Sequence, residues 1–291
     1  MITVVIPSFY SNHLVEKRIK EISNEVPVII VENSRDLNLK KKIEKEFNNV
    51  KVLIPDENLG FGGAYNLGIK NSKTEFVFLI QPDILLINDC IDKLIEFTKE
   101  FKDFSILTPY DKNDELWKNY EIYDNNKKEV KNNRYTLKEV DYVDLSWLIN
   151  KKNFSTEDFW DEKIFHYFEA ADFAKRLRDK KKKIFVVMEI NTYHIGAASH
   201  DKRLEFFSKL HRNWHYNWSR FYFNRKHYGY LHAYKKGLAL FIKLFLKLFI
   251  SLILFKKDEV KLKFAELHGL SASMVNARSY YRPYKNINLD N

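Results

Sequence analysis

At 291 residues, the chain is long enough for one large α/β domain plus an appendage. A single cysteine, Cys90, excludes an internal disulfide and indicates a reducing compartment, where we expect a plain buried thiol. A strand-like run starts directly at the N-terminus, without the basic and apolar regions of a signal peptide, so we expect a cytosolic location.

The net charge of +10 is distributed unevenly along the chain. Residues 200–291 contain 18 Lys and Arg against 6 Asp and Glu, a net charge of +12, which leaves residues 1–199 at −2. A basic C-terminal region predicts an anionic partner, either nucleic acid or phospholipid headgroups.

In the first part of the chain, apolar β-branched runs alternate with amphipathic patterns. We expect buried strands at residues 2–7, 26–34, 50–55 and 75–83, separated by helices at 11–24, 39–47 and 64–72. This alternation predicts right-handed βαβ units, a mostly parallel sheet and hence an α/β fold. The polar residues that follow the strands should then meet in one crevice at the carboxyl ends.

The pattern is less regular after residue 84. Residues 110–140 are polar and rich in Asn and Lys, which indicates a mobile excursion or an irregular hairpin. A strand resumes within residues 139–154, and a helix is expected at 163–179, with Glu169, Asp172 and Arg176 on one face. A last strand should follow at 183–196 and end near His194.

Four of the chain's 8 glycines fall within residues 60–68, where we expect the backbone to turn or to approach a ligand closely. The Walker phosphate-binding pattern fails because Gly68 is not followed by Lys and then Ser or Thr. The dinucleotide fingerprint fits poorly because Tyr65 takes the place of its third glycine, although Asp83 lies where a ribose-binding acid would be expected. A NAD-dependent enzyme therefore stays open as an alternative.

Six short motifs occur in an order that is informative as a set: VVIPSF, IIVENS, NLGFGGAYNLGI, FLIQPD, FWDEKIFHYFEAADFAKR and TYHIGAAS. In this order the sequence resembles family 2 glycosyltransferases with the nucleotide-sugar-binding GT-A fold, a Rossmann-like sheet with flanking helices. Within that family it most resembles the rhamnosyltransferase-like enzymes of bacterial O-antigen and capsule biosynthesis. The resemblance covers a GT-A domain at 1–200 and leaves a basic, aromatic, helical C-terminal region at 201–291.

The resemblance implies a set of donor-binding residues. Base and ribose would be held by Pro7, Ser8, Phe9, Glu32 and Asn33, and the sugar and diphosphate by Asn58, Gly60, Gly63 and Asn66. Glu32 as a simple cap of the next helix is the alternative.

The motif QPD, Gln81 to Asp83, matches the family's acidic metal-binding motif, and His194 matches a histidine that completes the metal site. A single carboxylate is sufficient for Mg²⁺ or Mn²⁺ if the diphosphate supplies most other ligands. The structural alternatives are that Asp83 forms a turn, and that His194 is a turn residue or contacts a ligand-binding residue without binding the ligand itself.

The chain departs from the family at the acceptor base. The family's second motif acid is replaced by Ala170 in the run Glu169-Ala170-Ala171-Asp172. Glu169 is one candidate for the base, and Asp172 is another if it does not simply pair with Arg176. The remaining alternatives are a base elsewhere in the chain and a protein that no longer transfers sugar. By resemblance Trp147 and Tyr167 would face the acceptor, with a core role for Trp147 as the alternative.

The C-terminal region combines aromatic and basic residues at 206–236, followed by an apolar run at 238–255. Lys243, Lys247 and Ser251 form one stripe on that run, and Phe249 lies among its apolar residues. Two central lysines disfavour a membrane-spanning helix, so we expect an amphipathic anchor that lies in the membrane plane, rather than nucleic acid binding. An oligomer interface, as in a homodimer, and a membrane span are the alternatives.

Together these features predict an inverting, metal-dependent glycosyltransferase on the inner face of a bacterial cytoplasmic membrane. It would transfer rhamnose from dTDP-rhamnose, or a hexose from a UDP-hexose, to a lipid-linked surface glycan. The rival hypotheses are a catalytically impaired nucleotide-sugar-binding scaffold and the NAD-dependent enzyme.

Overall fold

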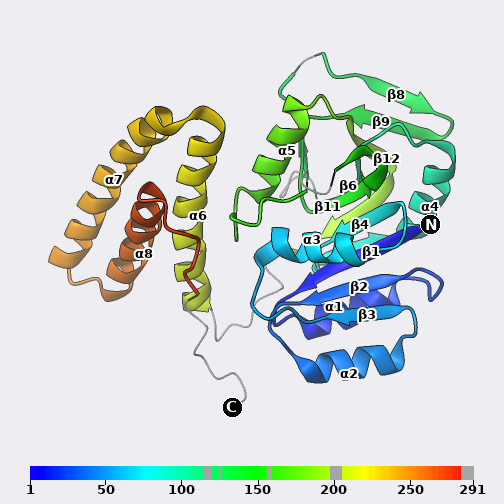
Figure 1. The fold of residues 1–291 in the computed structure, drawn as a ribbon, viewed down its shortest axis with the longest axis horizontal. Coiled ribbons are helices and arrows are strands. Elements are labelled where there is room, and N and C mark those ends of the chain that lie inside the picture. The colour runs from blue at the N-terminus through cyan, green and yellow to red at the C-terminus, as the bar shows by residue number, and fades with distance from the viewer. Residues whose placement is uncertain (114–118, 125, 156–158, 197–204, 283–291) are drawn as a thin grey trace. The chain divides into compact units, whose positions relative to one another are not determined.

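A computed structural model describes residues 1–113, 119–124, 126–155, 159–196 and 205–282 (Figure 1). The chain divides into two compact units, which are treated separately below. The first unit contains residues 1–160 and 170–199, and the second contains residues 161–169 and 200–291. The last three residues of the TYHIGAAS motif, 197–199, lie outside the described residues.

The N-terminal half of the first unit is a parallel βαβ arrangement, as predicted. Its strands are β1 (Ile2–Ser8), β2 (Val28–Glu32), β3 (Val50–Leu53) and β4 (Phe76–Ile80), and they lie in the order β3-β2-β1-β4. The connecting helices are α1 (Asn12–Lys20), α2 (Leu37–Glu46) and α3 (Gly60–Asn71). Every residue of β1, β2 and β4 is buried, because helices and the rest of the unit cover both faces of the sheet.

The second half of the sheet is mixed rather than parallel. β11 (Ser146–Asn150) lies between β4 and β6 (Ile106–Asp111) and is antiparallel to both, whereas β12 (Ile184–His194) is parallel to β6. The sheet continues beyond β12 with β9 (Tyr135–Glu139) and β8 (Glu129–Asn132), and β5 (Ile84–Ile87) also pairs with β12. The remaining elements of this unit are α4 (Cys90–Glu100), the two-stranded sheet of β7 (Tyr120–Glu121) and β10 (Tyr142–Val143), and the 3₁₀ turn Lys151–Asn153. β8 and β9 form an antiparallel hairpin, so the described part of 110–140 includes the irregular hairpin that the sequence left open.

The helix expected at 163–179 is shorter, because α5 spans only Glu169–Asp179. Tyr167 and Phe168 have φ angles of 63° and 66°, so the backbone is left-handed directly before α5 and cannot continue a right-handed helix. Residues 161–168 instead form a segment that belongs to the second unit.

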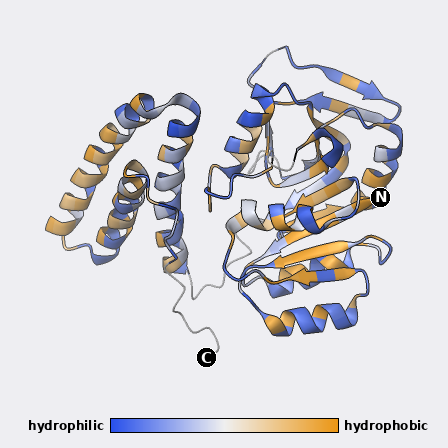
Figure 2. Ribbon diagram, viewed as in Figure 1, coloured by the Kyte–Doolittle hydropathy of each residue, from blue (hydrophilic) through white to orange (hydrophobic). Residues whose placement is uncertain are grey.

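The second unit is a bundle of α6 (Glu205–Tyr228), α7 (Tyr230–Ile253) and α8 (Lys257–Met274). Many aromatic residues of the 206–236 region form its core and are not available for base stacking; Trp214 is fully buried, and Trp218 and Phe221 are 3% and 2% exposed. Figure 2 shows many hydrophobic residues in α7, and several of them are exposed. Among the described residues, no helix combines the length and hydrophobicity needed to cross a membrane.

Candidate active site

The polar residues at the strand ends converge on one edge of the sheet. Ser8 and Glu32 are register partners at the ends of the parallel strands β1 and β2. Because β11 is antiparallel to both β4 and β6, β6 and its parallel neighbour β12 run in the same direction as β4. The end of β12 at His194 therefore lies at the edge where β4 ends and the QPD motif begins.

Asp83 and His194 face each other at this edge. The distance between Asp83 Oδ2 and His194 Nε2 is 3.3 Å, and the two residues are 5% and 7% exposed. The pairing of β5 with β12 brings them together, since Ile84 is the register partner of His194 and Ile195 N–H donates to the Asp83 carbonyl at 3.1 Å.

Two neighbouring groups hold the main chain at His194 and directly after Asp83. Asp111 accepts hydrogen bonds from His194 N–H at 3.3 Å and from the Thr192 hydroxyl at 3.1 Å. Arg18, which is fully buried, donates to the Ile84 carbonyl at 2.9 Å and also pairs with Glu21. Burial lowers the pKa of Arg18, while the charges of Glu21 and Asp83 act in the opposite direction.

Glu32 is fully buried and uses only one of its carboxylate oxygens within the described structure. Oε1 accepts from Ser34 N–H at 2.7 Å and from the Ser34 hydroxyl, whereas Oε2 has no hydrogen-bond partner among the described residues. The next helix is capped by Asp36, whose side chain accepts from Asn38 and Leu39 N–H, so the alternative role of Glu32 as that cap is wrong. A buried, half-satisfied carboxylate is suited to accept from a ligand N–H or O–H group.

Asn33 and Asn58 shape the backbone at the start of α3. Asn33 accepts from Leu59 N–H at 3.2 Å and donates to the Gly60 carbonyl, and Asn58 accepts from Gly60 N–H at 2.9 Å. Gly60 has a φ of 72°, a conformation that favours glycine. These two amides therefore fix the turn. Of the other residues predicted to bind the nucleotide, Pro7 and Ser8 are buried in β1, and Phe9 is partly exposed directly after β1.

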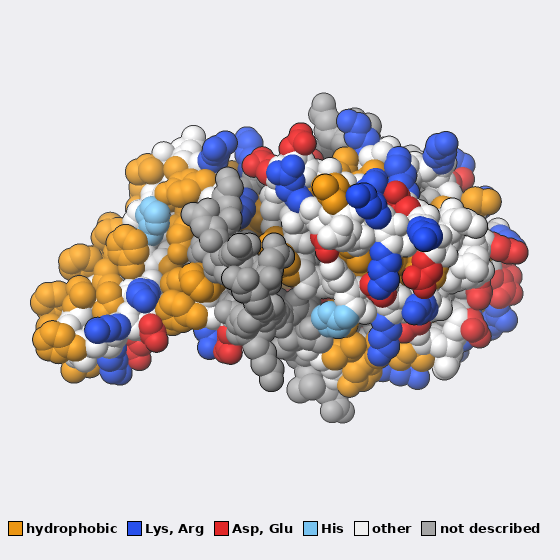
Figure 3. All heavy atoms as spheres, turned by 90° about the horizontal axis from the view of Figure 1, so that it is seen from below, with side chains coloured by type: hydrophobic (Ala, Val, Ile, Leu, Met, Phe, Trp, Pro, Cys, Tyr) orange, Lys and Arg blue, Asp and Glu red, His pale blue; other side chains and the backbone are white. Residues whose placement is uncertain are grey.

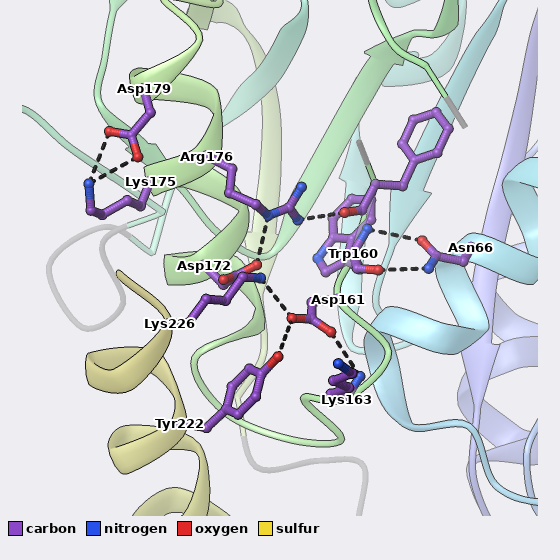
Figure 4. Close-up of polar contacts among 11 residues, drawn as sticks. Asn66, Trp160, Asp161, Lys163, Asp172, Lys175, Arg176, Asp179, Tyr222 and Lys226 are labelled. Carbon is purple, nitrogen blue, oxygen red and sulfur yellow. Dashed lines mark hydrogen bonds and ion pairs between the residues drawn. The ribbon is translucent and has the colours of Figure 1, made fainter. Parts of the chain in front are cut away.

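The glycine cluster lies inside α3 and serves close packing. A Cβ at Gly68 would lie 2.3 Å from Val5 Cγ1, and a Cβ at Gly62 would lie 2.9 Å from Trp160 Cβ. Asn66 brackets the same tryptophan, accepting from Trp160 N–H at 3.1 Å and donating to its carbonyl at 2.9 Å (Figure 4). The amide of Asn66 is thus engaged with protein backbone.

The acids of the α5 motif differ in their surroundings. Asp172 is 1% exposed and accepts from Arg176 Nε at 2.8 Å, so the ion pair that the sequence left open is present (Figure 4). Ala170, at the position of the family's usual acid, is buried in the apolar core with Phe173. Glu169 is the first residue of α5 and, like Tyr167, belongs to the second unit.

Trp147 lies in the core rather than at a surface. It is 2% exposed, and its ring centroid lies 5.5 Å from that of Tyr65 and 5.6 Å from that of Trp160. The side chain therefore packs between the sheet and α3 and presents almost no surface to a ligand.

Asp144 is a functional candidate that sequence reasoning missed. It lies two residues before β11, accepts from Tyr142 hydroxyl and Leu145 N–H at 2.8 Å each, and is coupled electrostatically to His194. Burial raises the pKa of Asp144, and the hydrogen bonds and the charge of His194 act against this. The sequence feature that could have identified Asp144 is an acid directly before a predicted strand. That strand, β11, starts at the edge where β4 ends, because Ser146 pairs with Ile80.

Asp83 and His194 provide two donor groups suitable for a divalent metal. Among the described residues there is no group of three or more His, Cys, Asp or Glu side chains that could hold a metal ion. One carboxylate and one imidazole nevertheless fit Mg²⁺ or Mn²⁺ when a diphosphate contributes further oxygen ligands.

The chain matches a known family over its first half. Residues 3–157 match the model of the family described as glycosyl transferase family 2, which is more than half of the chain. The chain belongs to this family. A search of curated proteins finds no match.

Solved structures share the fold at low sequence identity. The mannosyltransferase PcManGT from Pyrobaculum calidifontis, solved with GDP-Man and Mn²⁺, is similar with a TM-score of 0.55 and 10% identity over 94% of this chain and 86% of that one. S. aureus TarS 1–349 with UDP-GlcNAc is similar with a TM-score of 0.50 and 14% identity over 97% of this chain and 93% of that one. The first unit therefore has the α/β GT-A fold, and the chain has a helical C-terminal part in addition.

Proposed function

We propose that the protein is an inverting, metal-dependent glycosyltransferase that transfers rhamnose or a hexose from a nucleotide diphosphate sugar to a lipid-linked surface glycan. The observation that carries this proposal is the convergence of Glu32, Asp83 and His194 on the edge where the parallel strands end. Family membership and two structural neighbours solved with nucleotide sugars support the same activity class.

In this proposal the donor binds across the strand ends. Glu32 Oε2 accepts from an N–H of the base or a ribose hydroxyl, because this buried oxygen has no partner among the described residues. The backbone turn fixed by Asn33, Asn58 and Gly60 lines the sugar and diphosphate. We keep dTDP-rhamnose and UDP-hexoses as the candidate donors.

Asp83 and His194 would hold the divalent metal, whose positive charge would neutralise the leaving diphosphate when it is bound. Asp111 holds the backbone N–H of His194, and Arg18 holds the carbonyl of Ile84 next to Asp83, so this chain's own contribution is a preorganised pair of donors. The acceptor base is proposed to be Glu169, because Asp172 is buried in its pair with Arg176 and Ala170 lacks a carboxylate. Attack by the activated hydroxyl on the face opposite the diphosphate inverts the anomeric centre.

The lipid-linked acceptor is supported by the apolar surface of the helical unit, where nine Leu, Ile and Phe residues of α7 are each more than half exposed. An enzyme bound to the bilayer would encounter a lipid-linked acceptor by diffusion within the membrane plane. By the same reasoning we propose that the protein works on the inner face of a bacterial cytoplasmic membrane.

The test is a thermal-shift panel of nucleotide sugars and free nucleotide diphosphates, with and without Mn²⁺, on the wild type and Asp83→Asn. A ligand that binds only the folded protein raises the melting temperature according to RT ln(1 + [L]/Kd). We expect Mn²⁺-dependent stabilisation by one nucleotide class in the wild type and loss of the Mn²⁺ dependence in Asp83→Asn, with an unchanged melting temperature without ligand.

Equal Mn²⁺ dependence in both proteins would overturn the metal assignment. Stabilisation by NAD and by no nucleotide sugar would overturn the donor class. Donor binding without any sugar transfer or donor hydrolysis would favour the catalytically impaired scaffold suggested by Ala170.

A further inference from the structure

Helix α7 presents a broad apolar surface to solvent. Eight of its apolar side chains are between 51% and 58% exposed: Leu238, Ile242, Phe245, Leu246, Phe249, Ile250, Leu252 and Ile253. In Figure 3 the helical unit shows dense groups of hydrophobic side chains, with basic side chains beside them. Exposed apolar surface on this scale marks an interaction site rather than ordinary surface.

Only a narrow side of α7 packs into the bundle. Its buried residues are Ala233, Gly237, Leu244 and Ser251, which lie on one side of the helix. A Cβ at Gly237 would come within 2.9 Å of the Phe221 ring, so the helices approach closely along this seam. Ser251 donates to the Lys247 carbonyl at 2.9 Å and faces the bundle, so it is not part of an exposed polar stripe with the lysines.

Apart from Lys235, near the start of the helix, the remaining side chains of α7 separate by chemistry around the helix. At about 100° per residue, most of the exposed apolar residues fall on an arc opposite the seam, centred near Phe249. Lys236, Lys243 and Lys247 share the side between this arc and the seam, and all three are exposed. Tyr230 and Tyr234, which are 53% and 39% exposed, lie on the other side of the arc near the start of the helix.

The charge on α7 has one sign only. Residues 230–253 contain four lysines and no Asp or Glu. A second copy of this helix would bring like-charged rows towards each other, whereas anionic lipid headgroups would neutralise them. Apolar residues flanked by lysines and tyrosines are the pattern of a helix that lies in a membrane interface.

We propose that α7 docks the protein on an anionic phospholipid surface and lies in the membrane plane. The arc centred on Phe249 enters the acyl boundary, and Lys236, Lys243 and Lys247 remain at the headgroups. A spanning orientation would place Lys243 and Lys247 in the hydrocarbon interior, which the in-plane orientation avoids. This proposal rests on α7 alone and holds whether or not the protein transfers sugar.

The experiment is co-sedimentation of the full-length protein with phosphatidylcholine vesicles and with vesicles that also contain phosphatidylglycerol, without any donor. We expect strong binding to the anionic vesicles, weakening as salt rises. Each lysine near a membrane surface contributes about fivefold to binding, so Lys243→Gln with Lys247→Gln should weaken binding by about 25-fold.

Two matched controls separate local from general effects. Lys41→Gln with Lys45→Gln removes the same charge from exposed positions on α2 and should leave binding within about twofold. Phe245→Ser with Phe249→Ser should abolish sedimentation, whereas Leu37→Ser, at a side chain that is 61% exposed on α2, should not change it. These are surface positions, so folding is checked by an unchanged melting temperature.

Three results would overturn the proposal. The first is no sedimentation with any vesicle at low salt. The second is a concentration-dependent dimer in solution that Phe245→Ser with Phe249→Ser disperses, which would assign the face to a second copy. The third is retention in cell membranes after alkaline carbonate extraction, which would indicate a span.

Discussion

At the scale of single residues, the candidate site consists of polar groups that are held by main-chain contacts at the end of buried strands. Asp83 and His194 owe their separation of 3.3 Å to the β5–β12 pairing, and not to any local motif that contains both. Their separation of 111 positions in sequence explains why the pair could be expected only from family resemblance.

Glu32→Gln tests the proposed nucleotide contact of the buried carboxylate. The amide keeps the Oε1 acceptor for Ser34 but replaces the second oxygen by a donor, so a ligand N–H or O–H group loses its partner. A hydrogen bond to a charged group contributes about 1.5–3 kcal/mol, so we expect nucleotide affinity to fall by at least about tenfold in titration calorimetry.

The matched control for this change is Glu57→Gln, because Glu57 is an exposed acid in the loop between β3 and α3. Its nucleotide affinity should equal that of the wild type. If Glu32→Gln binds as tightly as this control, the nucleotide does not use Glu32.

Glu169→Gln compared with Asp172→Asn tests the acceptor base. A general base contributes about 10²–10⁴-fold, so Glu169→Gln should lower the transfer rate by about 10²-fold or more at unchanged donor affinity. Asp172→Asn should mainly lower stability, because it weakens the buried ion pair with Arg176.

Transfer rates and melting temperatures of both variants are measured together. The reverse pattern, with transfer lost in Asp172→Asn and retained in Glu169→Gln, moves the base to Asp172. Full transfer in both variants assigns it to another residue.

At the scale of elements, the glycines of α3 illustrate what the sequence conveyed and what it did not. A cluster within residues 60–68 indicated close backbone approach, and this is confirmed, but the nearest groups at Gly62 and Gly68 are Trp160 and Val5 rather than a ligand. Composition alone cannot distinguish a backbone that approaches a phosphate from one that approaches another part of the protein.

Gly68→Ala tests this packing. In an open helix the change would stabilise by about 1 kcal/mol. Here the new Cβ would lie 2.3 Å from Val5 Cγ1 in the sheet, so overpacking should instead lower stability by about 1–3 kcal/mol in urea unfolding. Adding Val5→Ala should recover part of this loss relative to Val5→Ala alone; strictly additive effects would rule out the contact.

Strands and helices with strong periodicity were predictable, whereas non-local pairings were not. The βαβ half follows the expected order, and β12 ends at His194 as predicted. The insertion of β11 between β4 and β6 depends on contacts between distant segments, so the mixed half of the sheet could not be read from local patterns. The late start of the predicted 163–179 helix likewise depends on Tyr167 and Phe168, whose side chains pack on Tyr216 of α6.

At the scale of the whole molecule, the two compact units are not separated by a single boundary in the sequence. The expected boundary after residue 200 overlooks residues 161–169, which group with the helical bundle. Ile164 is fully buried in the bundle core with Trp214, and Ser219 donates to the His166 carbonyl at 2.9 Å. The segment directly before α5 therefore folds as part of the basic C-terminal unit.

The ion pair of Asp161 makes this attachment sensitive to acid. The Asp161 carboxylate accepts from Lys226 Nζ at 2.7 Å and from the Tyr222 hydroxyl at 2.9 Å (Figure 4). Burial alone would raise the pKa of Asp161, but the hydrogen bond and charge of Lys226, together with the hydrogen bonds from Lys163 N–H and the Tyr222 hydroxyl, outweigh burial, and the pKa is lowered. An acid with a lowered folded-state pKa stabilises the fold above its unfolded value of about 3.9 and loses this contribution as pH falls through the folded value.

We therefore expect hydrogen exchange protection of α6 and of residues 161–169 to be constant near neutral pH and to fall below about pH 4, once the intrinsic pH dependence of exchange is corrected. Asp161→Asn should lose about 1–3 kcal/mol of this protection at pH 7, because Lys226 is left without its carboxylate, and should show a flatter acid dependence. Protection of β1 and β4 provides the internal control and should be equal in both proteins. If Asp161→Asn retains the acid dependence of the wild type, another carboxylate controls the attachment. If instead the variant alone loses hydrogen exchange protection at neutral pH, the Asp161–Lys226 pair holds the segment before α5 on the helical unit.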